Sequence, residues 1–218
     1  MVLQAVLFDF GNTLFAHLSL PATIVQAAGE LGCTVSGERA DALAARIEAA
    51  AHAPDELLHR RDFDAAVWRA RWHVLYGLAD DEIAGLGAAI YRLMHAPGEW
   101  VPYAGTVHTL RALQAASVPV GIVSNTGWDV RSVFRHHGVD DTVGHFVLSY
   151  EVGAVKPSPA IFSTACAALG AMPEDTLMVG DDPDADAGAV RAGLRTLLLP
   201  ALPSGRDNGV GDVLRLLR

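Results

Sequence analysis

The sequence predicts an α/β protein in which helices cover both faces of a parallel sheet, together with an all-helical insertion. The first observation is a set of short apolar runs, each closed by an acid or a turn residue, as buried strands are. Because these runs are apolar at nearly every position instead of alternating, they favour strands buried on both faces. They occupy residues 4–9, 118–123, 145–148, 176–179 and 195–199.

Helical stretches between the runs are the second observation. Their apolar residues recur with the period of an amphipathic helix, which packs one face on a sheet. Strands that alternate with such helices are typical of a parallel sheet. The expected helices occupy residues 105–116, 128–137, 158–169, 185–192 and 211–217.

The third observation is a long segment, residues 16–97, with helical periodicity throughout and no strand pattern. We expect Ser36, Asp62 and Asp80 to begin helices as N-caps. Helices are predicted over residues 21–31, 36–51, 62–76 and 80–95. The chain therefore divides into a core, residues 1–15 and 98–218, and a helical insertion, residues 16–97.

Composition excludes several classes of protein. The 218 residues are 51% hydrophobic and 19% charged, which rules out intrinsic disorder. A net charge of −9, with no basic run longer than Arg60-Arg61, argues against a nucleic-acid binder, which needs a phosphate-neutralising patch. No apolar run approaches the roughly 20 residues that cross a membrane, and two cysteines fit a reducing compartment. We expect a soluble cytoplasmic protein without nucleic-acid or membrane partners, of unspecified oligomeric state.

Polar residues follow three of the predicted strands. Asp9 closes the first, Ser124 and Asn125 follow the second, and Asp181 comes after the fourth. Ligands of open α/β sheets bind beyond the carboxyl ends of the strands, so these side chains are expected to converge. Lys156 is the only lysine in the chain and precedes the helix that leads into the fourth strand. The sequence therefore predicts one site with carboxylates, a hydroxyl and an ammonium group.

Four segments resemble the motifs of the haloacid dehalogenase-like hydrolase superfamily, and they occur in the order of that family. They are VLFDFGNTL (6–14), GIVSNTG (121–127), KPSPAIF (156–162) and VGDDPDADAGA (179–189). The resemblance is to phosphatase-type members with a helical cap inserted between the first two motifs. It implies a Rossmann-like catalytic core and a cap domain, residues 16–97, that closes over the site and selects the substrate.

The resemblance also implies a nucleophile and a Mg²⁺ cofactor. Asp9 would be the nucleophile that forms an aspartyl-phosphate during hydrolysis of a small phosphorylated substrate. Mg²⁺ would bind Asp9, the backbone carbonyl of Gly11 and Asp181, with Asp186 holding a metal-bound water. Asp182 is a weaker candidate for the same set of ligands, because it can equally cap the next helix.

Lys156, Ser124 and Asn125 are the implied phosphate-binding residues, with Lys156 and Ser124 also catalytic. Lys156 would lie beside Asp9, and Ser124 and the Asn125 amide would bind the phosphoryl oxygens. A carboxylate and a phosphate dianion repel each other by about 8 kcal/mol at about 4 Å and an effective dielectric of about 20. The attack therefore requires positive charge, which Lys156 and Mg²⁺ would supply, to offset this repulsion.

Gly11 departs from the phosphatase pattern. Most phosphatases of this family carry a second Asp there, which acts as a general acid for the leaving group. Because such help is typically worth about 10²–10⁴-fold, we expect slow hydrolysis biased to good leaving groups such as aryl or acyl phosphates. A substitute acid is the other interpretation, and His17 is the nearest titratable candidate.

The same departure leaves two rival functions open. Dehalogenases of the superfamily also lack the second Asp, but they work without a metal and lack the acidic pair of the fourth motif. Asp181 and Asp186 are present here, which favours phosphoryl chemistry. A binding or regulatory protein on the same fold is the third interpretation.

An aromatic and basic stretch marks the predicted cap. Trp68, Trp72 and Tyr76 recur every four residues, and such a stripe ordinarily faces packing, so we predict the core of the cap instead of a ligand platform. Arg60 and Arg61 are interpreted as solvated surface residues, with an anionic substrate tail as the alternative.

Overall fold

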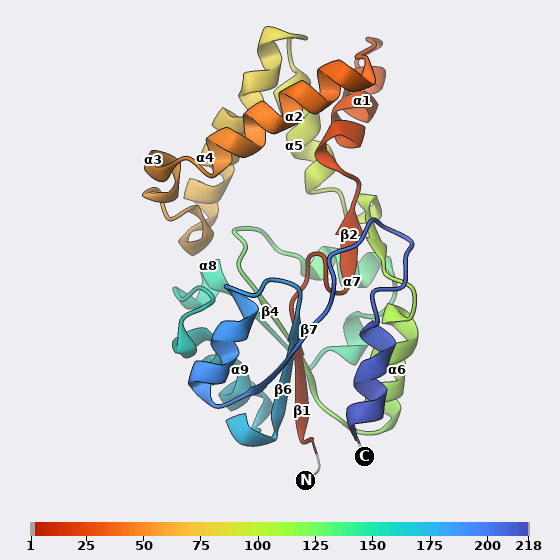
Figure 1. The fold of residues 1–218 in the computed structure, drawn as a ribbon, viewed down its shortest axis with the longest axis vertical. Helices are drawn as coiled ribbons and strands as arrows, with labels where there is room; N and C mark the ends of the chain where they lie inside the picture. Colours follow the sequence, from red (N-terminus) through yellow and green to blue (C-terminus); the bar gives the residue numbers. More distant parts are fainter. Residues whose placement is uncertain (1–2, 218) are drawn as a thin grey trace.

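The computed structural model describes residues 3–217, so residues 1, 2 and 218 of the predicted core lie outside the described residues. The main sheet is parallel, with the strand order β5-β4-β1-β6-β7 (Figure 1). Its strands are β1 (Ala5–Phe8), β4 (Val120–Ser124), β5 (His145–Leu148), β6 (Thr176–Gly180) and β7 (Arg195–Leu198). The predicted α/β class is confirmed, and each apolar run lies within two residues of its strand.

The central strand β1 shows why continuous apolar runs fold this way. All of its residues are fully buried. Val6 and Phe8 point into a cluster that contains Leu110 of α6 (Thr106–Ala115), whereas Leu7 points into the opposite cluster, with Phe162 of α9 (Pro159–Leu169). Both faces of the sheet are therefore covered, as the run pattern predicts.

Helices flank this sheet on two sides. In Figure 1, α6 and the C-terminal helix η7 lie on one side of β1 and α9 lies on the other. The helices are α6 (Thr106–Ala115), α7 (Arg131–His136), α8 (Ser149–Val152) and α9 (Pro159–Leu169), with the 3₁₀ helices η4 (Asp140–Thr142), η5 (Pro173–Asp175), η6 (Asp186–Ala192) and η7 (Val210–Leu217). Residues 185–192 and 211–217 are thus helical at the predicted places, but with the tighter 3₁₀ hydrogen bonding.

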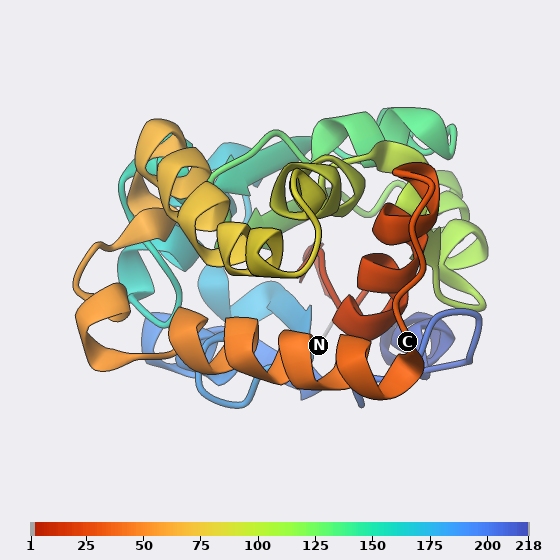
Figure 2. The same ribbon diagram turned by 90° about the horizontal axis from the view of Figure 1, so that it is seen from above.

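A separate group of helices stands beyond the carboxyl ends of the strands, as Figures 1 and 2 show. It has its own apolar cluster, in which Ile24, Ile47 and Ile90 are fully buried. The group comprises α1 (Leu20–Glu30), α2 (Gly37–Ala51), α3 (Pro54–Leu57), α4 (Ala65–Gly77) and α5 (Leu86–Met94), with η1 (Arg61–Phe63) and η2 (Leu78–Asp81). No helix within residues 3–217 is long and apolar enough to span a membrane.

A short antiparallel strand pair corrects the prediction of a strandless insertion. β2 (Phe15–His17) pairs with β3 (Trp100–Pro102), so Ala16 and His17 are strand residues. Each strand has three residues, which is too short for a periodic signal, and the partner lies beyond the whole insertion. η3 (Pro97–Glu99) precedes β3. The two strands carry the chain into and out of the helical group.

The predicted helix starts are corrected at two of three places. Ser36 caps α2 as predicted, by accepting from the Arg39 amide. Asp64, not Asp62, caps α4. Asp80 does not begin a helix that runs to residue 95, because the left-handed Gly85 separates η2 from α5. Asp62 and Asp64 both precede α4, so the residue type alone does not decide which of them is the cap.

Candidate active site

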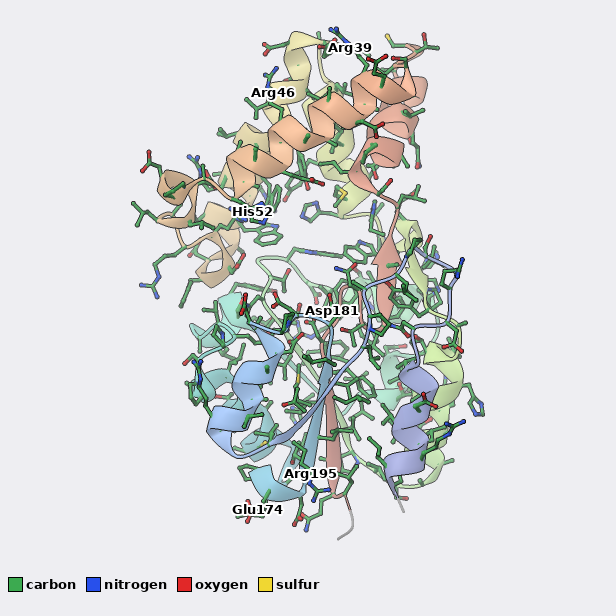
Figure 3. The ribbon with its side chains drawn as sticks, in the orientation of Figure 1. Arg39, Arg46, His52, Glu174, Asp181 and Arg195 are labelled. Atoms are coloured by element: carbon green, nitrogen blue, oxygen red, sulfur yellow. The ribbon has the colours of Figure 1, made fainter. Side chains whose placement is uncertain are left out.

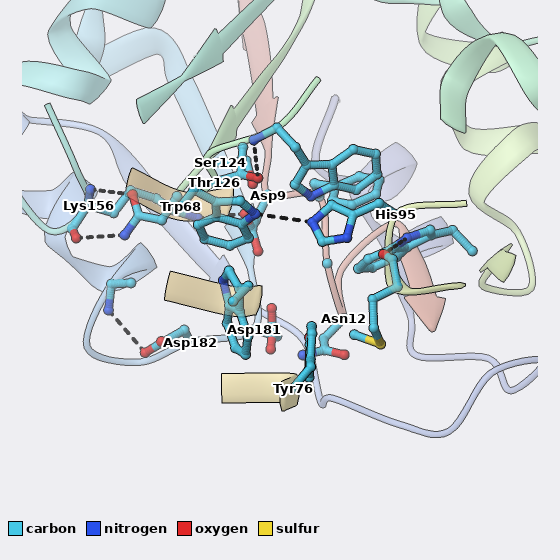
Figure 4. Close-up of a pocket in the computed structure, with 18 residues that line it drawn as sticks. Asp9, Asn12, Trp68, Tyr76, His95, Ser124, Thr126, Lys156, Asp181 and Asp182 are labelled. Atoms are coloured by element: carbon cyan, nitrogen blue, oxygen red, sulfur yellow. Dashed lines mark hydrogen bonds and ion pairs between the residues drawn. The ribbon is translucent and has the colours of Figure 1, made fainter. Parts of the chain in front are cut away.

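A cavity of about 330 Å³ lies between the carboxyl ends of the central strands and the helices α4 and α5 (Figure 4). In Figure 3, Asp181 marks the end of the sheet that faces the helical group, whereas Glu174 and Arg195 lie at the opposite end. The structure brings six predicted site residues to this cavity: Asp9, Gly11, Ser124, Asn125, Lys156 and Asp181. The seventh, Asp186, is fully buried and bonded to Lys156.

Lys156 is the centre of the polar floor. Its Nζ donates to Asp9 Oδ1 and to Asp186 Oδ1, at 2.6 Å in both cases. The side chain of Lys156 is only 3% exposed. Burial alone would lower the pKa of Lys156, but the two carboxylates raise it above its ordinary value. The ammonium group therefore stays charged where it touches Asp9.

Asp9 follows β1 and lies at the bottom of the cavity. Its amide donates to the Val179 carbonyl at 2.8 Å, which fixes the backbone against β6. Desolvation raises the pKa of Asp9 to about 7, with further contributions from Asp186 and Asp181, while Lys156 opposes the rise. Three carboxyl groups thus surround one ammonium group. The acidic groups outnumber the basic one, which favours binding of a further cation.

Asp186 is buried beneath the cavity floor and accepts hydrogen bonds from several of its groups. Its Oδ2 accepts from the amides of Asp181 and Asp182, both at 3.0 Å, while Oδ1 accepts from Lys156. A Cβ atom on Gly180 would collide with the Asp186 carboxyl, which explains the glycine at this position of the fourth motif. Asp186 thereby positions both the ammonium group and the turn that carries Asp181.

Asp181 and Asp182 have different surroundings. Thr13 Oγ1 donates to Asp181 Oδ1 at 3.0 Å, and burial raises the pKa of Asp181. Asp182 is exposed, and its Oδ1 accepts from the amides of Asp184 and Ala185. Asp182 therefore caps the turn before η6, which is the local role that its sequence position offers.

Asn125 fixes the backbone of Lys156. The Lys156 amide donates to Asn125 Oδ1 at 2.8 Å, and Asn125 Nδ2 donates to the Lys156 carbonyl at 2.9 Å. Ser124, the last residue of β4, is buried and lines the same floor. The predicted hydroxyl, amide and ammonium groups therefore belong to residues that line the same cavity as Asp9.

The acidic residues suit a divalent cation. Asp9, Asp181 and Asp186 each offer a carboxylate oxygen, and these oxygens lie within 4.8 Å of one another. Carboxylate oxygens are the ligands that Mg²⁺ prefers. The raised pKa values of Asp9 and Asp181 point the same way, because a cation relieves the repulsion that causes part of each rise.

The prediction that Trp68, Trp72 and Tyr76 form the core of the helical insertion instead of a ligand platform is only partly right. Tyr76 is buried and Trp72 packs on the core of the helical group, as predicted, but Trp68, Trp72 and Tyr76 all line the cavity as well. Trp68 lies directly on Gly127, where any Cβ atom would collide with it. The stripe therefore forms both packing core and cavity wall.

Sequence reasoning missed further wall residues, among them His95, Trp100 and Trp128. His95 Nδ1 lies 2.7 Å from the Tyr91 carbonyl, and Trp68 Nε1 donates to His95 Nε2 at 3.1 Å (Figure 4). A carbonyl only accepts and an indole N–H only donates, so the imidazole is neutral with its proton on Nδ1. No local spacing marks these residues, because His95 and Trp100 lie far in sequence from Trp128 and from the helix that carries Trp68.

His17 does not line the cavity, so the substitute-acid interpretation lacks the geometry that it needs. Its ring nitrogens lie 3.0 and 3.2 Å from the carbonyls of Leu18 and Leu93. The ring packs edge-on against Trp100, which does line the cavity.

Arg60 and Arg61 do not line the cavity either. Arg61 pairs with Glu56 and stacks over Trp72, whereas the exposed Arg60 lies over Phe63. The anionic-tail alternative therefore finds no support at these two residues.

Comparison with known proteins identifies the family. The sequence profile of the haloacid dehalogenase-like hydrolases matches residues 3–193, and the chain therefore belongs to this family. Its sequence is 35% identical over 99 residues to the glyceraldehyde 3-phosphate phosphatase of Methanopyrus kandleri, a match covering 44% of this chain and 42% of that protein. The chain spans less than two thirds of the length of the curated relatives that it matches.

Solved structures share the fold. A phosphatase of the family from Thermococcus onnurineus superposes with a TM-score of 0.65 at 21% identity, covering 98% of this chain and 97% of that one. A 2-haloacid dehalogenase from Pseudomonas syringae gives the same TM-score at 22% identity, covering 100% and 98%. Because both kinds of enzyme have this fold, the fold alone does not choose between them.

The neutral state of His95 gives a testable pH dependence. Burial lowers the pKa of His95 below its ordinary value of 6.5. The folded protein therefore binds fewer protons at His95 than the unfolded chain, and stability falls as the pH drops below about 6.5. We expect ¹⁵N NMR to show the His95 imidazole titrating below 6.5 with the proton on Nδ1. Titration above 6.5, or a proton on Nε2, would contradict the assigned hydrogen bonds.

Proposed function

We propose that this chain is a Mg²⁺-dependent phosphohydrolase that hydrolyses small phosphate monoesters through a phosphoryl group carried on Asp9. The observation that carries the proposal is the contact between Lys156 and Asp9, inside a cluster of carboxylates that suits a divalent cation. A nucleophilic carboxylate and a phosphate dianion repel each other, and this site has the means to offset that repulsion. Relatives named as phosphatases support the same reaction.

Asp9 is the proposed nucleophile. Lys156 binds Oδ1, and Oδ2 accepts no hydrogen bond within the described residues, so Oδ2 is the oxygen that attacks phosphorus. A bond forms between Oδ2 and phosphorus, and the ester P–O bond breaks with its electron pair leaving on the alcohol oxygen. Water then hydrolyses the aspartyl-phosphate, which returns Asp9 as a carboxylate.

Lys156, Ser124 and the Asn125 amide are proposed to hold the phosphoryl oxygens. They line the cavity beside Asp9 and bring one positive charge and two donors. Mg²⁺, held by Asp9, the Gly11 carbonyl and Asp181, would supply further positive charge against the phosphate. That Asp186 also holds a metal-bound water stays a prediction, while its contacts support a positioning role for Lys156.

The origin of the residues that line the cavity also suggests different roles for the two parts of the chain. We propose that residues 1–15 and 98–218 are the catalytic core and residues 16–97 the cap that selects the substrate, since the cap supplies Trp68, Trp72 and Tyr76 to the aromatic wall. A cytoplasmic location also stays a prediction from the sequence.

The retained acids favour this function over the rival interpretations. A dehalogenase of this family needs no metal, whereas Asp9, Asp181 and Asp186 gather their oxygens in one place. A pure binding protein needs neither a nucleophile nor a buried ammonium group in contact with it.

The direct experiment measures phosphate release from phosphate monoesters and acyl phosphates with and without Mg²⁺. We expect turnover that chelation abolishes, and a loss of at least about a thousandfold in Asp9→Asn, which keeps the shape but removes the nucleophile. Asp184→Asn is the matched control, because Asp184 is exposed and does not line the cavity. Halide release from haloacids that survives chelation would overturn the proposal in favour of a dehalogenase.

Gly11 predicts how the rate depends on the leaving group. Without an acid at this position, aryl phosphates should be hydrolysed much faster than alkyl phosphates. Gly11 is not in the left-handed region, and a Cβ there would meet Trp100 at an ordinary 3.7 Å, so a side chain fits.

We therefore expect Gly11→Asp to raise the turnover of alkyl phosphates by at least about tenfold relative to aryl phosphates. Gly11→Asn is the control, because it has the same shape and no acidic proton. Equal behaviour of the two variants, or a wild-type rate that ignores the leaving group, would refute the role assigned to position 11.

A further inference from the structure

The cavity is divided into a charged floor and a neutral wall. Its charged lining residues are Asp9, Lys156, Asp181 and Asp182, and all of them belong to the floor. The wall is formed by Phe10, Trp68, Trp72, Tyr76, Met94, His95, Trp100 and Trp128. A second phosphate or a carboxylate on the substrate would find no cation in this wall, and burying such a group unpaired is costly.

Half of the polar side chains of the wall are hydrogen-bonded within the protein, whereas those of Trp72, Tyr76 and Trp128 have no hydrogen bond among the described residues. Trp68 Nε1 donates to His95, and His95 Nδ1 donates to Tyr91. Trp100 Nε1 donates to the Met94 carbonyl at 3.2 Å. The wall thus combines a few hydrogen-bonding groups with several ring faces, which suits a flat aromatic group.

The rings are also held in place before a ligand arrives. The centroid of Trp100 lies 4.6 Å from that of Phe10 and 6.1 Å from that of Trp128. Trp68 packs 5.6 Å from Trp72 and rests on the backbone of Gly127. Aromatic surfaces fixed in this way lose little conformational freedom when they bind a flat ring.

Gly11 lies at the border between floor and wall. The rim of the Trp100 indole is 3.7 Å from the place where a Cβ of residue 11 would lie. An aromatic ring therefore stands beside the position where most phosphatases of this family have their general acid. A leaving group of low basicity needs no such acid, and phenols, with a pKa of about 10 like the tyrosine side chain, are leaving groups of this kind.

We propose that this site is specific for phosphate monoesters of planar aromatic alcohols, with the ring of the leaving group packed against Trp68, Trp100 and Trp128. This inference rests on the proposed phosphatase function and adds the substrate class. Two independent observations carry it: the neutral aromatic wall and the absence of an acid at Gly11.

A quaternary ammonium alcohol is the competing occupant of an aromatic wall, because cations bind the faces of such rings. Its alkoxide is a poor leaving group, however, and hydrolysis of its phosphate ester would need the acid that position 11 lacks. An aryl phosphate ester can pack on the aromatic wall, and its leaving group needs no general acid.

Phosphonates test the wall separately from the reaction, because their carbon–phosphorus bond is not hydrolysed. We would measure the affinity of the Mg²⁺-loaded protein for methylphosphonate, phenylphosphonate and 2-(trimethylammonio)ethylphosphonate by calorimetry. We expect phenylphosphonate to bind at least about tenfold more tightly than each of the others.

Variants locate the effect in the wall. Trp128→Leu should reduce the preference for phenylphosphonate over methylphosphonate to less than about threefold, and Trp68→Leu should do the same from the cap side. Val74→Ala is the control, because Val74 is exposed on α4 and does not line the cavity.

The outcomes separate this inference from the proposed function. Equal binding of methylphosphonate and phenylphosphonate, or tightest binding of the ammonium compound, would overturn the substrate class while the phosphatase proposal stands. A preference that survives in both tryptophan variants would also overturn it. If no phosphonate binds in the presence of Mg²⁺, both the phosphatase site and the substrate class are refuted.

Discussion

The contact of one buried ammonium group with two carboxylates is the interaction on which the rest of this site depends. Lys156 touches both Asp9 and Asp186, although its side chain is nearly inaccessible to water. Removing the ammonium group would leave both carboxylates without a cation, which is strongly destabilising in a buried site. The surrounding sequence therefore serves this contact: Asn125 fixes the Lys156 backbone, and Gly180 makes room for Asp186.

An aromatic wall gives the same site its second character. The floor is charged and hydrogen-bonded, whereas Trp68 of α4, Trp100 of β3 and Trp128 after β4 bring indole rings above it, and His95, just after α5, adds a neutral imidazole. Trp68 rests on Gly127 in the loop that follows β4, so the wall adjoins the residues that we propose bind phosphate. Gly11 affects both regions. The floor has no acidic side chain at this position, and the space beside the Trp100 ring of the wall stays open.

The sequence predicted the floor better than the wall, and the reason is physical. Parallel strands end at one edge of a sheet, so Asp9, Ser124 and Asp181 converge once their strands are recognised. His95, Trp100 and Trp128 come from segments whose meeting depends on how the cap packs on the core, and local spacing carries no such information. The periodicity of Trp68, Trp72 and Tyr76 identified their helix face but not that it borders a cavity. β2 and β3 were missed because each has three residues.

The central claim is that Asp9 accepts a phosphoryl group beside Lys156, and a trapped phosphate analogue tests it most directly. Crystals grown with Mg²⁺ and beryllium fluoride would reveal where this analogue attaches. The account predicts fluoroberyllate bonded to an Asp9 carboxylate oxygen, with Lys156 Nζ and Ser124 Oγ within hydrogen-bonding distance of its fluorine atoms. An unmodified Asp9, with fluoroberyllate absent from the cavity and the Lys156 ammonium group turned away, would contradict it.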